Sequence, residues 1–303
     1  MNCRAPSRAS SCVDSYAESV SEGEIEEQRE RLLDGWDHVA AGWGRQADRT
    51  QSVASPISEW MIDHAQPTPG ETVLELAAGP GDTGFMAAHR ISPGGTLICS
   101  DATNGMLAVA RERAQEQGVD NVEFKQLQLE WIDMPTASVD VALCRWGVML
   151  TLDPSAALRE CRRVLKPGGR FALAVWDQPE RNPWATVMQR TLVELGHAQP
   201  PAPGGPGMFA LAAPGQLQRM LEEAGFFDVE VEPVAITRRY ASVVDWLGET
   251  RDLSEQFGEV WAKLPDAQRQ EVRERVSLAA QPYVTETGEV ILPGSSLAAL
   301  AHA

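Results

Sequence analysis

Two stretches near the start of the chain carry apolar residues at the spacing of a helix. The first runs from about residue 24 to 43, and the second runs from Pro56 to Ala65. The apolar positions of the first are Leu32, Leu33, Trp36, Val39 and Ala40. Residues 1–23 lack this periodicity, and an acidic run begins at Asp14 and continues to Glu30, which indicates a loosely held acidic arm. The pattern therefore predicts an arm at 1–23 and an N-terminal helical lid at 24–66.

After these helices the period changes, and short apolar runs alternate with helical patterns. The expected strands are 72–76, 96–100, 122–124, 139–144, 171–176, 229–234 and 289–292. Thr103 and Asp153 stand where helix N-caps are expected, and Gly118 stands where a helix should end. Strands that alternate with helices are typical of βαβ units joined by right-handed crossovers. We therefore predict an α/β fold with a doubly wound, seven-stranded, mostly parallel sheet, and a short helix after the last strand.

Two stretches interrupt the alternation. Residues 177–213 are rich in proline and predict an irregular insertion with one helix near 184–195. Residues 240–285 contain two further helical patterns. Together with 24–66, these insertions are expected to form substrate lids on a domain that spans residues 67–303. Their tryptophans suggest an apolar or aromatic small molecule, although each one could simply anchor its own helix.

Composition restricts the class of partner. The 303 residues include 26 Lys and Arg and 43 Asp and Glu, which gives a net charge of −17. Such a charge repels phosphate backbones and disfavours a nucleic-acid partner. No apolar run reaches the roughly 18 residues of a membrane span, and the N-terminus lacks the apolar core of a secretory signal. Five scattered cysteines without a C-x-x-C pair indicate a reduced, cytoplasmic protein without a metal site.

The first expected strand runs into a glycine-rich turn. Residues 79–84 read Gly-Pro-Gly-Asp-Thr-Gly, and Asp101 stands 20 residues after Gly81 at the end of the second strand. This pattern is typical of dinucleotide binding, because small residues let the backbone approach phosphate and a carboxylate accepts from ribose hydroxyls. The same chemistry serves any adenosine cofactor. The pattern therefore leaves nicotinamide cofactors and S-adenosylmethionine (SAM) open.

Glu75 favours SAM. It stands inside a strand that should be buried, where an ionised carboxylate is costly unless something pairs with it. A nicotinamide cofactor would bring more negative charge, whereas SAM brings an ammonium and a sulfonium group. The alternative is a Glu75 that faces solvent or accepts hydrogen bonds from the loop.

Five segments, in order, resemble the motifs of class I SAM-dependent methyltransferases. They are VLELAAGPG (73–81), DATNGML (101–107), QLE (128–130), VDVALC (139–144) and VLKPGGR (164–170). The resemblance covers about residues 71–234 and is nearest to the small-molecule enzymes that include ubiquinone/menaquinone C-methyltransferases. It implies a Rossmann-like methyltransferase fold with SAM as cofactor.

The resemblance also implies roles for single residues. The implied cofactor-binding set is Glu75, Ala77, Gly79, Gly81, Asp101, Ala102, Met106, Gln128, Leu129 and Cys144. Glu75 and the turn would hold the methionine end of SAM, and Asp101 would accept both ribose hydroxyls. Ala102 and Met106 would pack on the adenine, and residues 128–129 would meet its edge. Cys144 and its neighbours would line the site near the methyl group.

Two residues depart from the family pattern. Ala77 replaces a glycine, so its Cβ must clear the cofactor. Gln128 replaces an acid that accepts from the adenine amino group, and an amide oxygen is a weaker acceptor than a carboxylate. Either change could lower the affinity for SAM.

No general base is evident in the sequence. His197, in the first insertion, is a weak candidate. Trp146 could line the methyl-transfer chamber or pack between sheet and helix. Arg145 could orient a carboxylate or phenolate substrate, or it could be a structural ion-pair partner. The expected substrate-lining residues are Trp36, Trp43, Arg145 and Trp146.

These inferences predict a SAM-dependent methyltransferase that moves a methyl group to a small, apolar or aromatic organic acceptor by in-line displacement. Alignment of the acceptor with the carbon–sulfur bond would supply much of the rate. The alternatives are a non-catalytic SAM-binding partner subunit and an NAD(P)-dependent oxidoreductase. The acceptor atom and the oligomeric state stay open.

Overall fold

The computed structural model describes residues 22–200 and 205–303. Its strands are β1 (Thr72–Glu75), β2 (Thr96–Asp101), β3 (Val122–Gln126), β4 (Val139–Arg145), β5 (Leu165–Trp176), β6 (Phe227–Tyr240) and β7 (Val290–His302). Its helices are α2 (Glu22–Arg45), α3 (Ala47–Ala65), α4 (Asp82–Ile91), α5 (Asn104–Gln117), α6 (Pro154–Val164), α7 (Pro183–Glu194), α8 (Gln216–Glu223), α9 (Val243–Leu253), α10 (Glu255–Lys263) and α11 (Asp266–Ala280). Short 3-10 helices are η1 (Val148–Leu150), η2 (Pro179–Arg181) and η3 (Gln281–Tyr283). The acidic arm expected at 1–23 lies outside the described residues, except for its last two positions, which begin α2.

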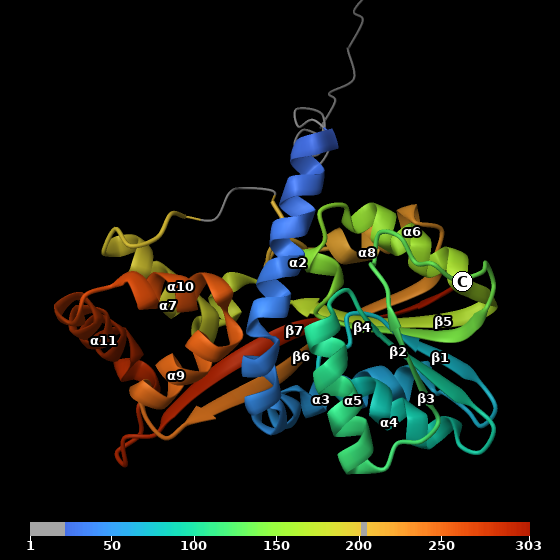
Figure 1. Cartoon of the computed structure of the whole chain (residues 1–303), viewed down its shortest axis with the longest axis horizontal. Helices are drawn as coiled ribbons and strands as arrows, with labels where there is room; N and C mark the ends of the chain where they lie inside the picture. Colours follow the sequence, from blue (N-terminus) through green and yellow to red (C-terminus); the bar gives the residue numbers. More distant parts are fainter. Residues whose placement is uncertain (1–21, 201–204) are drawn as a thin grey trace, which may run out of the picture.

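The strands form one sheet in the order β3-β2-β1-β4-β5-β7-β6. Strands from β3 to β5 pair in parallel, whereas β7 runs antiparallel to both β5 and β6. Helices cover both faces of this sheet (Figure 1). The predicted α/β fold with a seven-stranded, mostly parallel sheet is confirmed. The order of the strands reverses at β1, because β2 and β3 are added on one side of it and β4 and β5 on the other. Open α/β sheets bind ligands in the crevice at such a switch point.

Side-chain caps fix the helices that follow β2 and β4. The Thr103 side chain accepts a hydrogen bond from the backbone N–H of Met106, and Asp153 accepts one from Ala156. Gly118 ends α5 in the left-handed conformation, with φ of 68°. These contacts satisfy N–H and C=O groups that a helix end leaves free, so the boundaries predicted from cap residues are confirmed.

The prediction of a short helix after the last strand is wrong. The chain continues as β7 to His302 and pairs with β5 on one side and β6 on the other. Residues 298–301 are buried there. A strand enclosed on both faces reads as a continuous apolar run, which spacing alone cannot distinguish from a buried helix.

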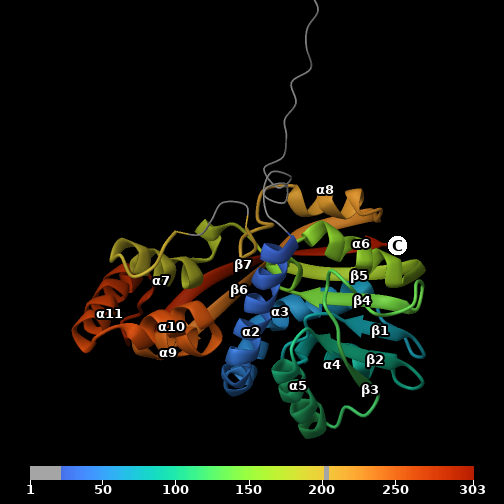
Figure 2. The same cartoon turned by 45° about the horizontal axis from the view of Figure 1, so that its top comes forward.

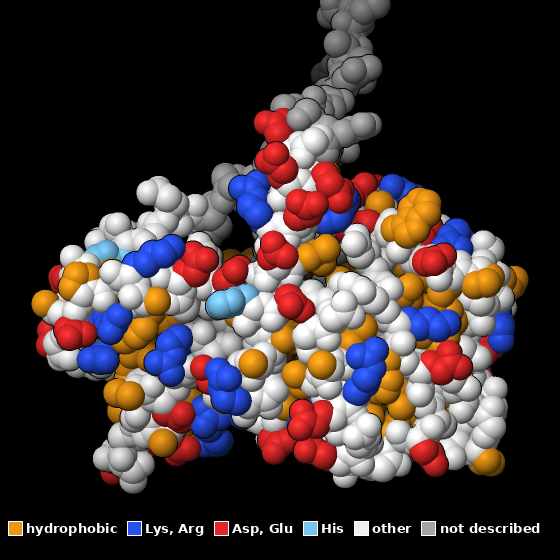
Figure 3. Space-filling model, in the orientation of Figure 1, with side chains coloured by type: hydrophobic (Ala, Val, Ile, Leu, Met, Phe, Trp, Pro, Cys, Tyr) orange, Lys and Arg blue, Asp and Glu red, His pale blue; other side chains and the backbone are white. Residues whose placement is uncertain are grey.

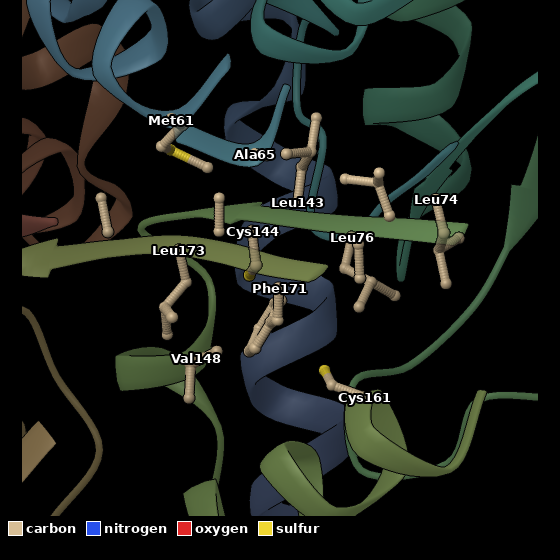
Figure 4. Packing of buried hydrophobic residues seen from close by; sticks show 14 of the residues in the cluster. Met61, Ala65, Leu74, Leu76, Leu143, Cys144, Val148, Cys161, Phe171 and Leu173 are labelled. Atoms are coloured by element: carbon tan, nitrogen blue, oxygen red, sulfur yellow. The ribbon is translucent and has the colours of Figure 1, made fainter. Parts of the chain in front are cut away.

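Helix α3 belongs to the main core. Ile57, Met61 and Ala65 are fully buried against the sheet. Figure 4 shows Met61 and Ala65 on one side of the strands and Phe171 on the other. Within the segment 24–66, the long helix α2 is therefore the part that stands free of the sheet, beside α5 (Figures 1 and 2).

The two insertions build a second apolar core. Helices α7, α9, α10 and α11 gather at one end of the long strands β6 and β7 (Figures 1 and 2). Trp246, Val272, Val276 and Leu292 are enclosed in this cluster. The apolar positions of 177–213 and 240–285 are thus used largely for packing among these helices.

The burial of α3 predicts a stability effect. Replacing Met61 with alanine should lower the free energy of unfolding by about 2–5 kcal/mol, because it leaves a cavity between α3 and the sheet. Urea denaturation followed by circular dichroism measures this change. The matched control, Leu278→Ala, removes an apolar side chain that is 56% exposed and should change stability by less than about 0.5 kcal/mol. Equal effects of the two substitutions would contradict the core assignment.

Candidate functional site

A cavity lies outside the carboxyl ends of β1, β2 and β4. It contains about 1090 Å³ of space, including the part open to solvent. Its walls come from the turn after β1, the start of α5, residues 127–130 after β3 and residues 145–152 after β4. Helix α2 supplies the remaining wall through Arg29, Leu32, Leu33, Trp36 and Trp43. Because the four segments other than α2 follow four different strands, only the folded sheet brings them together.

The structure brings most of the expected site residues to this cavity. The expected residues that line it are Trp36, Trp43, Glu75, Ala77, Gly79, Asp101, Ala102, Met106, Gln128, Leu129, Arg145 and Trp146. They come from segments up to about 110 positions apart in the sequence. Their convergence supports the prediction that they form one site.

Three expected residues lie elsewhere. Gly81 has a φ of 89°, and a Cβ there would overlap the Phe85 ring, so this glycine serves the turn itself. Cys144 is fully buried beneath Gly147, away from the cavity wall. His197 follows α7 in the first insertion and does not line the cavity. The two insertions expected to form lids, 177–213 and 240–285, likewise supply none of the described residues that line the cavity. Helix α9 of the second insertion instead contacts α2, where Trp43 Nε1 donates to a backbone carbonyl of α9.

Glu75 ends β1 with its carboxyl group enclosed. The residue is 2% exposed, and its Oε2 accepts no hydrogen bond from the described residues. Burial raises the pKa of Glu75 to about 8, against the opposing effects of the Gly84 backbone N–H and the charge of Arg145. A Cβ at Gly84 would overlap Oε2 of this carboxyl group, so the last glycine of the loop is required by Glu75 and Oε2 lies against the start of α4. Glu75 also lines the cavity, from which a cation could approach its carboxyl group.

Asp101 ends β2 and holds the neighbouring turns. Its Oδ2 accepts from the Gly79 backbone N–H at 3.0 Å, and its Oδ1 accepts from both the N–H and the hydroxyl of Thr103, at 3.1 and 3.3 Å. Burial raises the pKa of Asp101, while these hydrogen bonds oppose the rise. Asp101 lines the cavity, and Oδ2 retains a lone pair for a further donor.

A buried ion cluster lies under the glycine turn. Asp82 Oδ1 accepts from Arg113 at 2.9 Å, and its Oδ2 accepts from Arg145 at 3.3 Å. Arg145 is enclosed, and its Nε and Nη1 donate to no described residue. Burial lowers the pKa of Arg145, with Asp82 and Glu75 acting against this change.

Trp146 is held in a strained backbone conformation. Its φ is 64°, in the left-handed region that non-glycine residues rarely adopt. The Nε1 atom donates to Ser296 at 2.9 Å, and the ring stacks on Trp176 with centroids 4.1 Å apart. These contacts fix the indole as one wall of the cavity. Ala77 is also left-handed, with φ of 49°, which explains in physical terms why the family pattern has glycine there.

Sequence reasoning missed part of the wall. Leu32 and Leu33 were recognised as one face of a helix, but spacing does not tell what that face covers. Glu130 also lines the cavity, and its Oε1 accepts from the backbone N–H groups of Leu152 and Asp153. These hydrogen bonds connect the segment after β3 to the segment after β4, and the local sequence pattern does not predict them.

Comparison with known proteins gives the family. Residues 67–225 match a family model described as a methyltransferase domain, which is more than half of the chain. The chain belongs to the methyltransferase family. The SAM-dependent class, the Rossmann-like fold and SAM as the family's cofactor, all inferred from the motifs, are therefore confirmed.

The methyltransferase has relatives of known name. It is 33% identical over 188 residues to an arsenite methyltransferase from Halobacterium salinarum, which covers 62% of this chain and 44% of that protein. It is 28% identical over 157 residues to the ubiquinone/menaquinone biosynthesis C-methyltransferase UbiE from Cellvibrio japonicus, which covers 51% of this chain and 63% of that protein. The chain thus spans about half the length of the curated relatives it matches. The crystal structure of YcgJ from Bacillus subtilis superimposes with a TM-score of 0.56 at 22% identity, over 81% of this chain and 97% of that one, and supports the fold.

The residues at the cavity fit SAM. The buried Glu75 carboxyl group suits an ammonium group, and Asp101 suits a pair of hydroxyls.

Among the described residues, no cluster of His, Cys, Asp or Glu could hold a metal ion. None of the described helices combines the length and the apolar character that crossing a membrane requires.

The contact between Glu75 and Gly84 in the methyltransferase can be tested by a double-mutant cycle. Gly84→Ala should lower the free energy of unfolding by about 1–3 kcal/mol, because the new Cβ displaces the Glu75 carboxyl group. In a Glu75→Ala background the same change should be neutral or stabilising, since alanine is a better helix former by about 1 kcal/mol. Thermal unfolding of the four proteins gives the coupling. Additive effects would contradict the contact.

The raised pKa of Glu75 predicts how stability depends on pH. Between pH 4.5 and 8 the folded methyltransferase keeps a proton that the unfolded chain has released, so stability falls as pH rises through this range. Glu75→Gln removes the ionisation while keeping the shape. The variant should gain stability over the wild type by up to about 1.4 kcal/mol per pH unit from pH 5 to 8.

Urea denaturation of the ligand-free proteins at several pH values measures this difference. Asp63→Asn is the control, because that side chain is 62% exposed and its removal should leave the pH profile nearly parallel to that of the wild type. A Glu75→Gln profile parallel to the wild-type profile would contradict the burial of an ionisable Glu75.

Proposed function

We propose that this chain is an enzyme that transfers the methyl group of SAM to a small organic acceptor. One observation carries the proposal: the carboxyl groups of Glu75 and Asp101, from neighbouring parallel strands, line the same cavity. SAM supplies a methyl group already activated by a positively charged sulfur. A cavity that presents two carboxyl groups suits such a cation and its ribose, whereas the phosphates of a nicotinamide cofactor would add negative charge beside Glu75.

The lining residues divide the cofactor's contacts between them. Glu75 would pair with the ammonium group, and Asp101 would accept from the ribose hydroxyls. Met106 and Leu129 line the cavity and would present apolar surface to the adenine, with Gln128 near its edge. This arrangement would follow the order β1, β2, β3 along the sheet, with the adenosine end extending away from β4.

The acceptor side is apolar and aromatic. Leu33 of α2, and Trp146 and Leu150 after β4, line the cavity. Trp36 and Trp43 of α2 also line it and pack against the cluster that contains Met106 of α5. This surface favours an apolar or aromatic organic acceptor. The three described cysteines, at 99, 144 and 161, are buried and none lines the cavity, so the described wall offers no thiolate for a soft arsenic centre.

The residues of the wall indicate how the chain would act on the acceptor. None of the described lining residues is a histidine, and Oε1 of the lining Glu130 already accepts from two backbone N–H groups. The protein would therefore work by alignment and by exclusion of water, which together account for several kcal/mol of a barrier. Trp146 would contribute the edge of its ring to the wall near the reacting centre, because the ring stacks on Trp176 and the Arg145 guanidinium lies over it.

Removal of the Asp101 carboxylate tests cofactor binding. Asp101→Ala should weaken binding of S-adenosylhomocysteine by about 1–3 kcal/mol, or about 5- to 150-fold, because the ribose loses its charged acceptor and the neighbouring turns lose the three hydrogen bonds that Asp101 accepts. Asp101→Asn keeps one acceptor oxygen and should lose less. Asp63→Ala, an exposed carboxylate on α3, is the control. Isothermal titration measures each constant, and an unchanged constant for Asp101→Ala would contradict the assigned role.

Incubation of the protein and methyl-deuterated SAM with a metabolite extract tests the reaction itself. Mass spectrometry should detect a small molecule that gains one labelled methyl group. Tight binding of S-adenosylhomocysteine without any labelled product would instead indicate a non-catalytic SAM-binding partner subunit.

A further inference from the structure

We propose that Arg145 binds a carboxylate group of the acceptor, so that the cavity selects small aromatic or apolar acids. The inference rests on the proposed function for the reaction, but the anion site is argued from Arg145 itself. This residue ends β4 and lines the cavity beside Trp146. Its side chain is 8% exposed, so any partner must come from within the cavity or the core.

The guanidinium group has donors to spare. Its Nη2 reaches Asp82 at 3.3 Å, while Nε and Nη1 have no hydrogen-bond partner among the described residues. Buried donors without acceptors are costly, and a planar guanidinium matches the two oxygens of a carboxylate. The Cζ atom lies 4.7 Å from the centroid of the Trp146 ring, which holds the cation at the acceptor side of the cavity.

A purely structural ion pair would make poor use of this residue. Asp82 is already bound by Arg113 at the shorter distance of 2.9 Å. Glu75 attracts Arg145 electrostatically, yet Glu75 Oε2 and two Arg145 nitrogens all stay without a partner. The cavity therefore offers a carboxylate acceptor at Glu75 and a cationic donor at Arg145, side by side and both incompletely satisfied.

Position separates Arg145 from the adenosine end of the cofactor. Arg145 ends β4, whereas Asp101 ends β2 on the opposite side of β1. The adenosine end would extend toward β2 and β3, so Arg145 would lie near the methionine end and the methyl group, where the acceptor must approach. The anion is then a carboxylate of the acceptor, as we propose, or the carboxylate of the cofactor itself, and the experiment below distinguishes the two. The other described cation of the wall, Arg29, also has an Nε without a partner, but its Nη1 is paired with Glu26 at 2.6 Å and its side chain is 27% exposed. It stands near the free end of α2, where Figure 3 shows acidic side chains gathered.

Paired ligands that differ only in charge test the proposal. The probes are benzoic, 4-hydroxybenzoic and phenylacetic acids, each compared with its neutral amide, added to protein saturated with S-adenosylhomocysteine. Isothermal titration and tryptophan fluorescence measure the constants, since Trp146 contacts the guanidinium. At least one acid should bind at least tenfold more tightly than its amide, and Arg145→Met should abolish that preference. Arg145→Lys should retain part of it, because the charge remains but the fork is lost.

The matched control is Arg159→Met, which makes the same substitution at an arginine of α6 that is 60% exposed and does not line the cavity. It should keep the full preference for the acid. Arg145→Met should fold, because Asp82 retains Arg113, and thermal unfolding of each variant confirms this.

Two results would overturn the inference. In one, no acid of the panel binds the loaded wild-type protein more tightly than its amide. In the other, Arg145→Met weakens S-adenosylhomocysteine tenfold or more without changing the preference for acids, which would assign Arg145 to the cofactor's own carboxylate. Failure of the wild type to bind S-adenosylhomocysteine, measured before any acid is added, contradicts the proposed function separately.

Discussion

The enclosed carboxyl group of Glu75 restricts which side chains can stand next to it in the glycine loop and at the end of β4. A charge at the end of a buried strand is unfavourable unless a cation reaches it, and the loop above it is built of residues that leave the approach open. Gly84 has no side chain to collide with it, and Arg145 lies near enough to attract it without satisfying it. A site that keeps such a group is prepared for a positively charged ligand.

The topology of the sheet gives this carboxyl group its surroundings. Because β1 is flanked by β2 on one side and β4 on the other, the residues after these strands meet at one edge. Asp101 stands on one side of Glu75, and Arg145 and Trp146 stand on the other. Asp101, which can accept hydrogen bonds from hydroxyl groups, and Arg145, which can donate to an anion, therefore line one cavity on either side of β1, together with apolar residues of α2.

Local signals in the sequence predicted the parts of the fold that depend on neighbouring residues. The caps at Thr103 and Asp153 and the carboxylates at Glu75 and Asp101 each stand beside their own turn, so their places could be inferred. What failed depends on distant partners. Strand β7 takes its conformation from β5 and β6, and the insertion helices, with His197, follow an apolar core of their own. Nothing within those segments tells which surface they will cover.

A crystal structure of the protein with S-adenosylhomocysteine tests the account most directly. It should place the amino group of the ligand within hydrogen-bond distance of Glu75, both ribose hydroxyls at Asp101, and the sulfur facing Trp146. A nucleoside bound elsewhere, or a ligand whose amino group turns away from Glu75, would contradict the claim that this buried carboxyl group exists to hold a cation.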